Sequence, residues 1–297
     1  MGKSFHNITF FIVIGYIIIV CIFLFWHRVG FSPDQFFVVA LLITLLLGRM
    51  KQFIHDWSIP VVLFLSYDYL RGLVPKLTIN AYVYPMINFD KAVFGSIPVN
   101  ILQDFLFKNG VINWYDYLAT IFYMSHFIVP MVLAFILWLK NKKYFEQYTL
   151  SLIIVSYAAF VTFILFPAVP PWMASERGAI PNVYKIMNQV FASLPQPVDL
   201  PSAYQFFGAN LVAAVPSLHA AYPWLTLLFF ITASSKPRSL RWLVAIYVLG
   251  VWFSLVYLGE HYVFDILIGA IYATFSYILV FNSNKIWQRA TQLIPKF

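Results

Sequence analysis

Long apolar runs separated by short polar segments dominate the pattern along the chain. The pattern predicts eight membrane spans, at about residues 8–26, 34–48, 57–74, 115–139, 147–166, 216–234, 240–258 and 262–282. A helix that crosses the hydrocarbon core needs about 20 residues, so the second run is short for a crossing. The predicted fold class is all-α, a polytopic membrane helical bundle.

Composition supports this interpretation. Hydrophobic residues make up 62% of the 297 residues and charged residues only 10%, whereas a soluble domain carries about 25% charged residues. The first run resembles a secretory signal peptide only superficially, because it has no small-residue cleavage site and is long enough to span. Cys21 is the single cysteine, so no internal disulfide can form.

Charge predicts the orientation. If the N-terminus is inside and the spans alternate, the inner side holds twelve of the nineteen cations and only two acids, Asp56 and Glu146. The inner cations are Lys3, Arg49, Lys51, Lys140, Lys142, Lys143, Lys236, Arg238, Arg241, Lys285, Arg289 and Lys296. Such an excess predicts that both termini are cytoplasmic. Because the cations gather at helix ends, the pI of about 9.4 does not indicate a nucleic-acid partner.

Two long segments are predicted on the outer side, at about 75–114 and 167–215. Residues 86–107, MINFDKAVFGSIPVNILQDFLF, have the character of an amphipathic or re-entrant element at the interface, with a plain surface loop as the alternative. The predicted organisation is N-terminal transmembrane helices over 1–52, a catalytic membrane domain over 53–285, and a cytoplasmic tail over 286–297.

Candidate chemistry lies at two outer boundaries. His219 is near the outer start of one predicted span, and the chain returns to the same face at His261. Asp265 follows His261 by four residues, so the two share a helix face. A carboxylate there can accept a hydrogen bond from one ring nitrogen and leave the other free to attack.

Pro216 and Ser217 fit the start of a helix. The N–H groups of a helix start favour an anion, so Ser217 is a candidate phosphate-binding residue. Two alternatives remain: each histidine merely bonds a neighbouring helix, or His219, His261 and Asp265 ligate a metal. No nearby cluster supplies further ligands of that kind, so no metal and no cofactor are predicted.

PSLH at 216–219 together with HYVFD at 261–265 resembles the type-2 phosphatidic acid phosphatase superfamily, which carries Pro-Ser-x-His and His-x-x-x-Asp elements. The resemblance covers roughly the last 240 residues and implies a six-helix core, with about two extra N-terminal helices here. It implies that His261 is a nucleophile that forms a phosphohistidine. It also implies that His219 protonates the leaving group and that Asp265 orients His261, with no metal.

The sequence departs from the common hydrolase pattern. Leu218 stands where Gly is usual, and Leu255 stands where an Arg is expected. The expected Lys/Arg-Pro element is not recognisable, and FPAVPPWMASERG occupies its place at 166–178. These features are more similar to the inositol phosphorylceramide synthase branch, which also has Pro-Ser-Leu-His and His-Tyr-x-x-Asp.

Other residues are candidates to replace the missing cations. Arg71, with Asp68 one turn before it, is the first candidate for phosphate binding, and Arg177 and Lys185 follow. For the last two, an ordinary surface cation is the alternative. His126 lies inside a predicted span and is a possible part of the substrate pocket, with a packing histidine as the alternative.

The sequence therefore predicts a membrane enzyme that moves a phosphoryl-containing group from a lipid donor to a lipid alcohol on the extracytoplasmic face. A lipid phosphate phosphatase, with water as acceptor, is the first alternative. A non-enzymatic transporter is the second, disfavoured because the polar residues lie near one boundary and not at the bilayer centre. The implied partners are the two lipids, and the oligomeric state is left open.

Overall fold

The computed structural model describes residues 33–77, 80–194, 210–232 and 237–282. These residues form helices and no strand; two isolated bridges, Tyr82 with Ala168 and Ala168 with Ala213, are the β-type pairings among them. The predicted all-α membrane fold is confirmed. The first predicted span, with Cys21, and the predicted tail lie outside the described residues.

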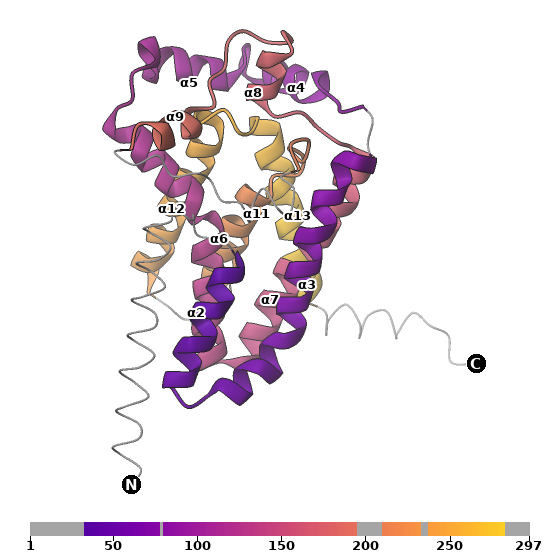
Figure 1. The fold of residues 1–297 in the computed structure, drawn as a ribbon, viewed down its shortest axis with the longest axis vertical. Coiled ribbons are helices and arrows are strands. Elements are labelled where there is room, and N and C mark those ends of the chain that lie inside the picture. The colour runs from indigo at the N-terminus through magenta and orange to yellow at the C-terminus, as the bar shows by residue number, and fades with distance from the viewer. Residues whose placement is uncertain (1–32, 78–79, 195–209, 233–236, 283–297) are drawn as a thin grey trace, which may run out of the picture. The chain divides into compact units, whose positions relative to one another are not determined.

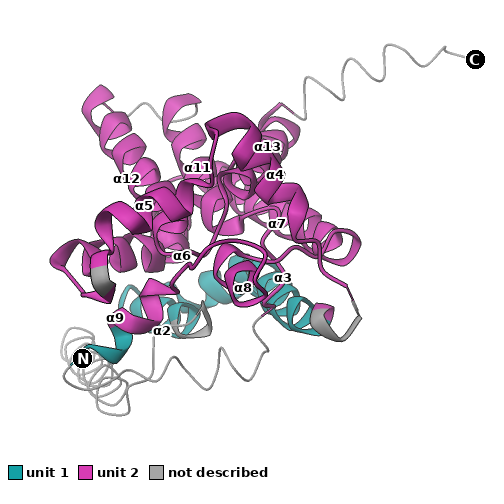
Figure 2. Cartoon of the chain, turned by 90° about the horizontal axis from the view of Figure 1, so that it is seen from above, with its two compact units in different colours: residues 1–73, 191–209 teal, residues 74–190, 210–297 magenta. Residues whose placement is uncertain are grey.

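The chain divides into two compact units (Figure 2). The first comprises residues 1–73 and 191–209, and the second comprises residues 74–190 and 210–297. In the first unit, α2 (Pro33–Leu46) and α3 (Met50–Leu77, which ends within the second unit) correspond to the second and third predicted spans. Gly48 joins them with φ +67°, a left-handed conformation that costs glycine little.

Aromatic side chains hold the first unit together. The rings of Phe37 and Phe64 stack with their centroids 6.4 Å apart, and Trp57 is fully buried beside Phe37. At 14 residues, α2 is shorter than a bilayer crossing, as the sequence suggested.

Among the described residues, four helices, all of the second unit, are long and apolar enough to cross a membrane: α6 (Trp114–Lys140), α7 (Lys142–Leu165), α12 (Arg238–Tyr257) and α13 (Val263–Phe281). The shorter helix α11 (Leu218–Thr232) packs against all four (Figure 1). The first turn of α11, which carries His219, is therefore held among the long helices.

Hydrogen bonds between hydroxyl groups fix α11 in this central place. Tyr148 and Thr226 bond at 2.7 Å between α7 and α11, and Ser156 and Tyr222 do the same at 2.7 Å. The indole N–H of Trp224 donates to Thr274 on α13 at 2.9 Å. Such bonds are common between membrane helices, where apolar burial alone does not distinguish neighbours from lipid.

Large apolar side chains cover the outside of α12 and α13. They recur about once per helical turn and are exposed: Leu243, Ile246, Leu249 and Phe253 on α12, and Leu267, Ile271, Phe275 and Ile278 on α13. A soluble monomer rarely exposes an apolar surface this wide, so these faces contact lipid.

Short helices cover the end of the bundle at which α13 begins (Figure 1). They are α4 (Tyr84–Phe94), α5 (Pro98–Leu106), the short η1 (Lys108–Gly110), α8 (Pro171–Glu176) and α9 (Ile186–Ala192). The predicted interfacial element 86–107 is thus two helices. Gly95, with φ +74°, ends the first, and Pro98 starts the second, since proline suits the first helical turn.

Candidate active site

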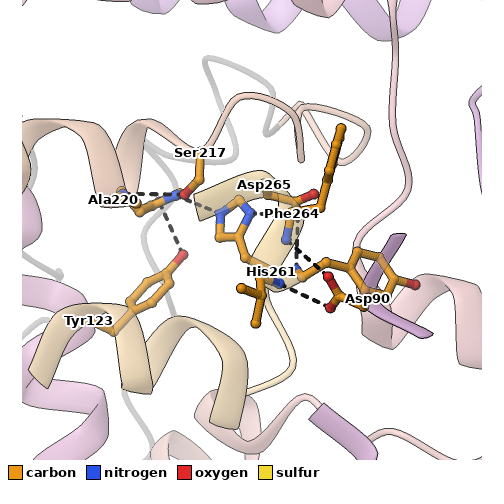
Figure 3. Close-up of polar contacts among 10 residues, drawn as sticks. Asp90, Tyr123, Ser217, Ala220, His261, Phe264 and Asp265 are labelled. Atoms are coloured by element: carbon orange, nitrogen blue, oxygen red, sulfur yellow. Dashed lines mark hydrogen bonds and ion pairs between the residues drawn. The ribbon is translucent and has the colours of Figure 1, made fainter. Parts of the chain in front are cut away.

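The turn before α13 carries His261, and the first turn of α13 carries Asp265. The Nδ1 atom of His261 lies 3.2 Å from Oδ2 of Asp265, and the N–H of Tyr262 donates to the same oxygen at 3.0 Å. Asp265 is fully buried and His261 nearly so. One carboxylate therefore caps its own helix and orients the imidazole (Figure 3).

His219 comes from the first turn of α11 and meets His261 directly. Its Nδ1 atom lies 3.1 Å from Nε2 of His261. Because Asp265 accepts the Nδ1 proton of His261, the Nε2 atom of neutral His261 has a lone pair. His219 must then donate its own Nδ1 proton across the gap. The two histidines and the aspartate form one directional chain.

Two residues of α6 extend this chain on the far side of His219. The hydroxyl of Tyr123 lies 3.2 Å from Nε2 of His219, and the two rings stack with centroids 5.0 Å apart. The ring of His126 lies edge-on to His219 with centroids 4.2 Å apart, and its Nδ1 bonds the carbonyl of Tyr123 at 2.6 Å. The predicted pocket residue His126 thus contacts His219, whereas sequence reasoning missed Tyr123.

Ser217 is the N-cap of α11. Its side-chain oxygen accepts from the N–H of Ala220 at 3.3 Å, and its own N–H donates to the carbonyl of Asp265 at 3.0 Å (Figure 3). Ser217 is completely buried, so its side chain holds the helix start. The start of α11 is therefore less open than the sequence suggested, since two of its N–H groups already have protein acceptors.

Gly269 allows the starts of α11 and α13 to touch. A Cβ atom at this position would lie 2.3 Å from the carbonyl oxygen of Ser217, which is backbone and cannot rotate away. A side chain there would separate the two segments that carry His219 and Asp265. This is a close approach that only glycine permits.

The turn that leads to His261 is tied down from two other helices. The side-chain amide of Gln103, on α5, donates to the carbonyl of Tyr257 at 2.8 Å and to that of Tyr184 at 2.9 Å. The Tyr257 hydroxyl donates to Asp116 on α6. These bonds hold the C-terminal end of α12, and with it the turn that carries His261, from α5 and α6.

Asp90, which lies on α4 and which sequence reasoning also missed, anchors the start of α13. Its two carboxylate oxygens accept the N–H groups of Val263 at 3.1 Å and Phe264 at 3.0 Å (Figure 3). Burial, with a smaller effect from the nearby charge of Asp265, raises the pKa of Asp90 to about 6. The signal in the sequence was an acid within the largely apolar segment 86–107, which also contains Asp104.

The three cations predicted as candidates for phosphate binding lie in different places and have different partners. Arg71 belongs to the first unit, where it pairs with Asp68 at 3.4 Å. Arg177 follows α8, is exposed and contacts the sulfur of Met173. Lys185 pairs with Glu260 at 3.8 Å and lies 4.5 Å from the centroid of the Trp172 ring. Of the three, Lys185 is the cation that pairs with Glu260, the residue directly before His261.

Glu260 precedes His261 in the turn. Burial raises the pKa of its carboxyl, and the charges of Lys185 and His261 oppose that rise. The Lys185 ammonium is therefore largely committed to a protein carboxylate.

Leu218 and Leu255, which depart from the hydrolase pattern, are both buried. The carbonyl of Leu255 accepts the N–H of His261 at 3.0 Å and that of Glu260 at 3.1 Å. Leu255 thus shapes the turn through its backbone while its side chain packs in the core. Within the described ranges, no group of three or more His, Cys, Asp or Glu side chains is arranged to hold a metal ion.

The fold and the site together define a polytopic membrane protein with a His-His-Asp cluster at one end of its helices, in which His261 and Asp265 are buried and His219 is partly buried. The family model described as PAP2 superfamily matches residues 85–279, and the chain therefore belongs to that superfamily. The chain is 27% identical over 259 residues to the phosphoinositol dihydroceramide synthase of Bacteroides thetaiotaomicron, an alignment that covers 81% of each protein. No solved structure matches the chain significantly. These similarities place it among membrane enzymes that act on lipid phosphates.

Proposed function

We propose that the protein transfers a phosphoryl-linked head group from a phosphodiester lipid to the hydroxyl of a ceramide-like lipid. The observation that carries the proposal is the chain of hydrogen bonds from Asp265 through His261 to His219. It supplies an oriented nucleophile with a proton donor beside it, which is what a two-step transfer requires.

In the first step, Nε2 of His261 attacks phosphorus. An N–P bond forms, the bond between phosphorus and the diacylglycerol oxygen breaks, and the departing oxygen takes the Nδ1 proton of His219 in its imidazolium form. Asp265 stabilises the positive charge that develops on His261. The products are diacylglycerol and a phosphohistidine that carries the head group.

In the second step, Nδ1 of His219, now without its proton, accepts the hydroxyl proton of the acceptor lipid. The acceptor oxygen attacks phosphorus, the N–P bond breaks, and His261 is regenerated. His219 ends the cycle with the proton it began with. Because both steps use residues of this chain, the proposal needs no metal ion.

Two features support transfer over hydrolysis. Apolar helices cover the end of the bundle at which the histidines lie, and exclusion of water there protects a phosphohistidine. Lys185 is paired with a carboxylate, so a donor phosphate with one negative charge suits the site better than a monoester with nearly two. The Bacteroides relative is named as a synthase of this kind.

The test uses the purified full-length protein in detergent micelles with phosphatidylinositol that carries a labelled head group. We expect label to move to dihydroceramide when it is supplied, in the presence of chelator, and to be released slowly to water when it is not. Rapid release of phosphate from phosphatidic acid, with no label trapped by added lipid alcohols, would establish the phosphatase alternative instead. Loss of activity with chelator and recovery with zinc would overturn the metal-free mechanism.

A further inference from the structure

The hydroxyl of Tyr123 is placed to control the proton of His219. It lies 3.2 Å from Nε2, the ring nitrogen that faces away from His261. The Tyr123 side chain is 8% exposed, so water does not readily replace it. His126 holds this stretch of α6 against His219, because its Nδ1 bonds the Tyr123 carbonyl and its ring contacts the His219 ring.

The hydrogen-bond chain decides whether Nε2 of neutral His219 needs a hydrogen-bond donor or an acceptor. Asp265 and His261 together require the proton of neutral His219 to sit on Nδ1. Nε2 then carries a lone pair and needs a donor, which the Tyr123 O–H provides. The other tautomer of His219 would set two lone pairs against each other across 3.1 Å.

Before the reaction, neutral His219 takes up one more proton from solvent to become the imidazolium acid, and the need of Nε2 reverses. When His219 is an imidazolium, Nε2 carries a proton and needs an acceptor, and the same need holds after Nδ1 has given its proton away. A hydroxyl both donates and accepts through one oxygen, so Tyr123 can partner Nε2 in all three states. An imidazolium N–H left without a partner in this partly buried position would be costly.

We propose that Tyr123 is a positioning residue for the acid-base histidine: it partners Nε2 in every protonation state, so that proton exchange with substrate is confined to Nδ1. It does for His219 what Asp265 does for His261. The proposal rests on the acid-base role proposed for His219, and not on which alcohol accepts the head group.

The test is Tyr123→Phe, which keeps the stacked ring and removes one oxygen. Two donors are compared within one preparation: a natural phosphodiester lipid, whose alkoxide leaving group needs a proton, and an aryl phosphodiester, whose phenolate does not. With the acceptor lipid left out, so that only the first step is followed, we expect release of the leaving group from the natural donor to slow by about 10- to 100-fold and release from the aryl donor to stay near the wild-type rate. Because the readout is a ratio between donors, it does not depend on the fraction of folded protein.

The matched control is Tyr148→Phe, which removes a buried hydroxyl bonded to Thr226 and should leave the ratio unchanged. The double variant Tyr123→Phe with His219→Gln should be no slower than His219→Gln, since Tyr123 acts only through His219. Equal loss on both donors, or additive losses, overturns the proposal. If His219→Gln itself shows no dependence on the leaving group, the proposed acid role fails, which is a different result.

Discussion

Nδ1 of His219 and Nε2 of His261 lie 3.1 Å apart, within hydrogen-bonding distance. A phosphorus atom must approach the attacking nitrogen to about 3–3.5 Å with its other oxygens around it, so it cannot fit between the two rings as they stand. Substrate binding must therefore replace the hydrogen bond between the histidines with bonds to phosphate. In the proposed mechanism, the same exchange of partners frees His261 to attack and His219 to protonate the leaving oxygen.

This relationship predicts that the roles of the two histidines can be distinguished by experiment. His261→Gln should abolish formation of a base-stable phosphohistidine with any donor, because the attacking nitrogen is gone. His219→Gln should still form it from an aryl phosphodiester, whose leaving group needs no proton, and should fail with the lipid donor. The measurement is label retained on the denatured protein. Retention of label by His261→Gln would remove His261 from the nucleophile role.

Asp265→Asn should keep the helix cap, since an amide oxygen can still accept the Tyr262 N–H. It should lower turnover by about 10²–10⁴-fold, because a neutral amide no longer stabilises charge on His261. Steady-state rates and thermal stability are measured on the same preparation. Near-normal turnover in a folded variant would show that Asp265 does not support the nucleophile.

The sequence was sufficient for the long helices and for the central contact of the site. Apolar runs of bilayer length predicted α6, α7, α12 and α13 to within a few residues. The opposing directions of α11 and α12 explain why His219 and His261, far apart in the chain, could be expected at one end of the bundle. Local patterns and alternation of spans carry that much information.

Contacts that depend on side-chain packing between distant segments could not be predicted in this way. Asp90 meets Val263 and Phe264 across more than 170 positions, and no spacing in the sequence marks the pair. Tyr123 is one of 19 tyrosines, and only the packing of α6 against α11 distinguishes it. Arg71 has the expected local partner, Asp68, but an ion pair between near neighbours in the chain does not show whether Arg71 binds the substrate phosphate.

Gly269→Ala should separate the two halves of the site. The added Cβ would lie 2.3 Å from the Ser217 carbonyl oxygen, so α11 or α13 must shift. We expect turnover to fall by about 10²-fold or more, since displacements near 1 Å have that effect on positioned groups. Gly250→Ala is the control, because its Cβ meets the Phe122 ring, a side chain that can rotate. Equal activity of both variants would contradict the close packing described at Gly269.

The charge asymmetry predicts which side of the membrane each end of the bundle faces. In a Cys21→Ser background, Glu176→Cys, beside α8, should react with an impermeant maleimide from outside intact cells. Lys143→Cys, at the opposite end of the bundle, should react only after the membrane is opened. Both positions are exposed, so access to the reagent is set by sidedness. The reverse pattern would place the histidine site on the cytoplasmic face.

Asp90 predicts a dependence of stability on pH. Its pKa rises from 3.8 to about 6 in the folded protein, mainly because burial disfavours the charged carboxylate. The titratable groups near it are Asp265, whose charge opposes its ionisation, and Tyr262, whose pKa is raised by burial so that it stays neutral in this range. Between these two pKa values the folded state binds a proton that the unfolded state has lost. The contribution of Asp90 to stability therefore falls as pH rises from about 4 to about 6, and is constant above that.

Asp90→Asn removes this titration and keeps one oxygen that can accept from Val263 or Phe264. Thermal unfolding is measured in detergent. The free energy of unfolding of the variant, relative to that of the wild type, should rise by up to about 3 kcal/mol between pH 4 and pH 6 and stay constant from pH 7 to pH 8. The comparison cancels other groups that titrate in both proteins. If the wild type instead gains on the variant as pH rises, the two N–H bonds to the ionised carboxylate outweigh its burial, and the pKa of Asp90 lies below its ordinary value.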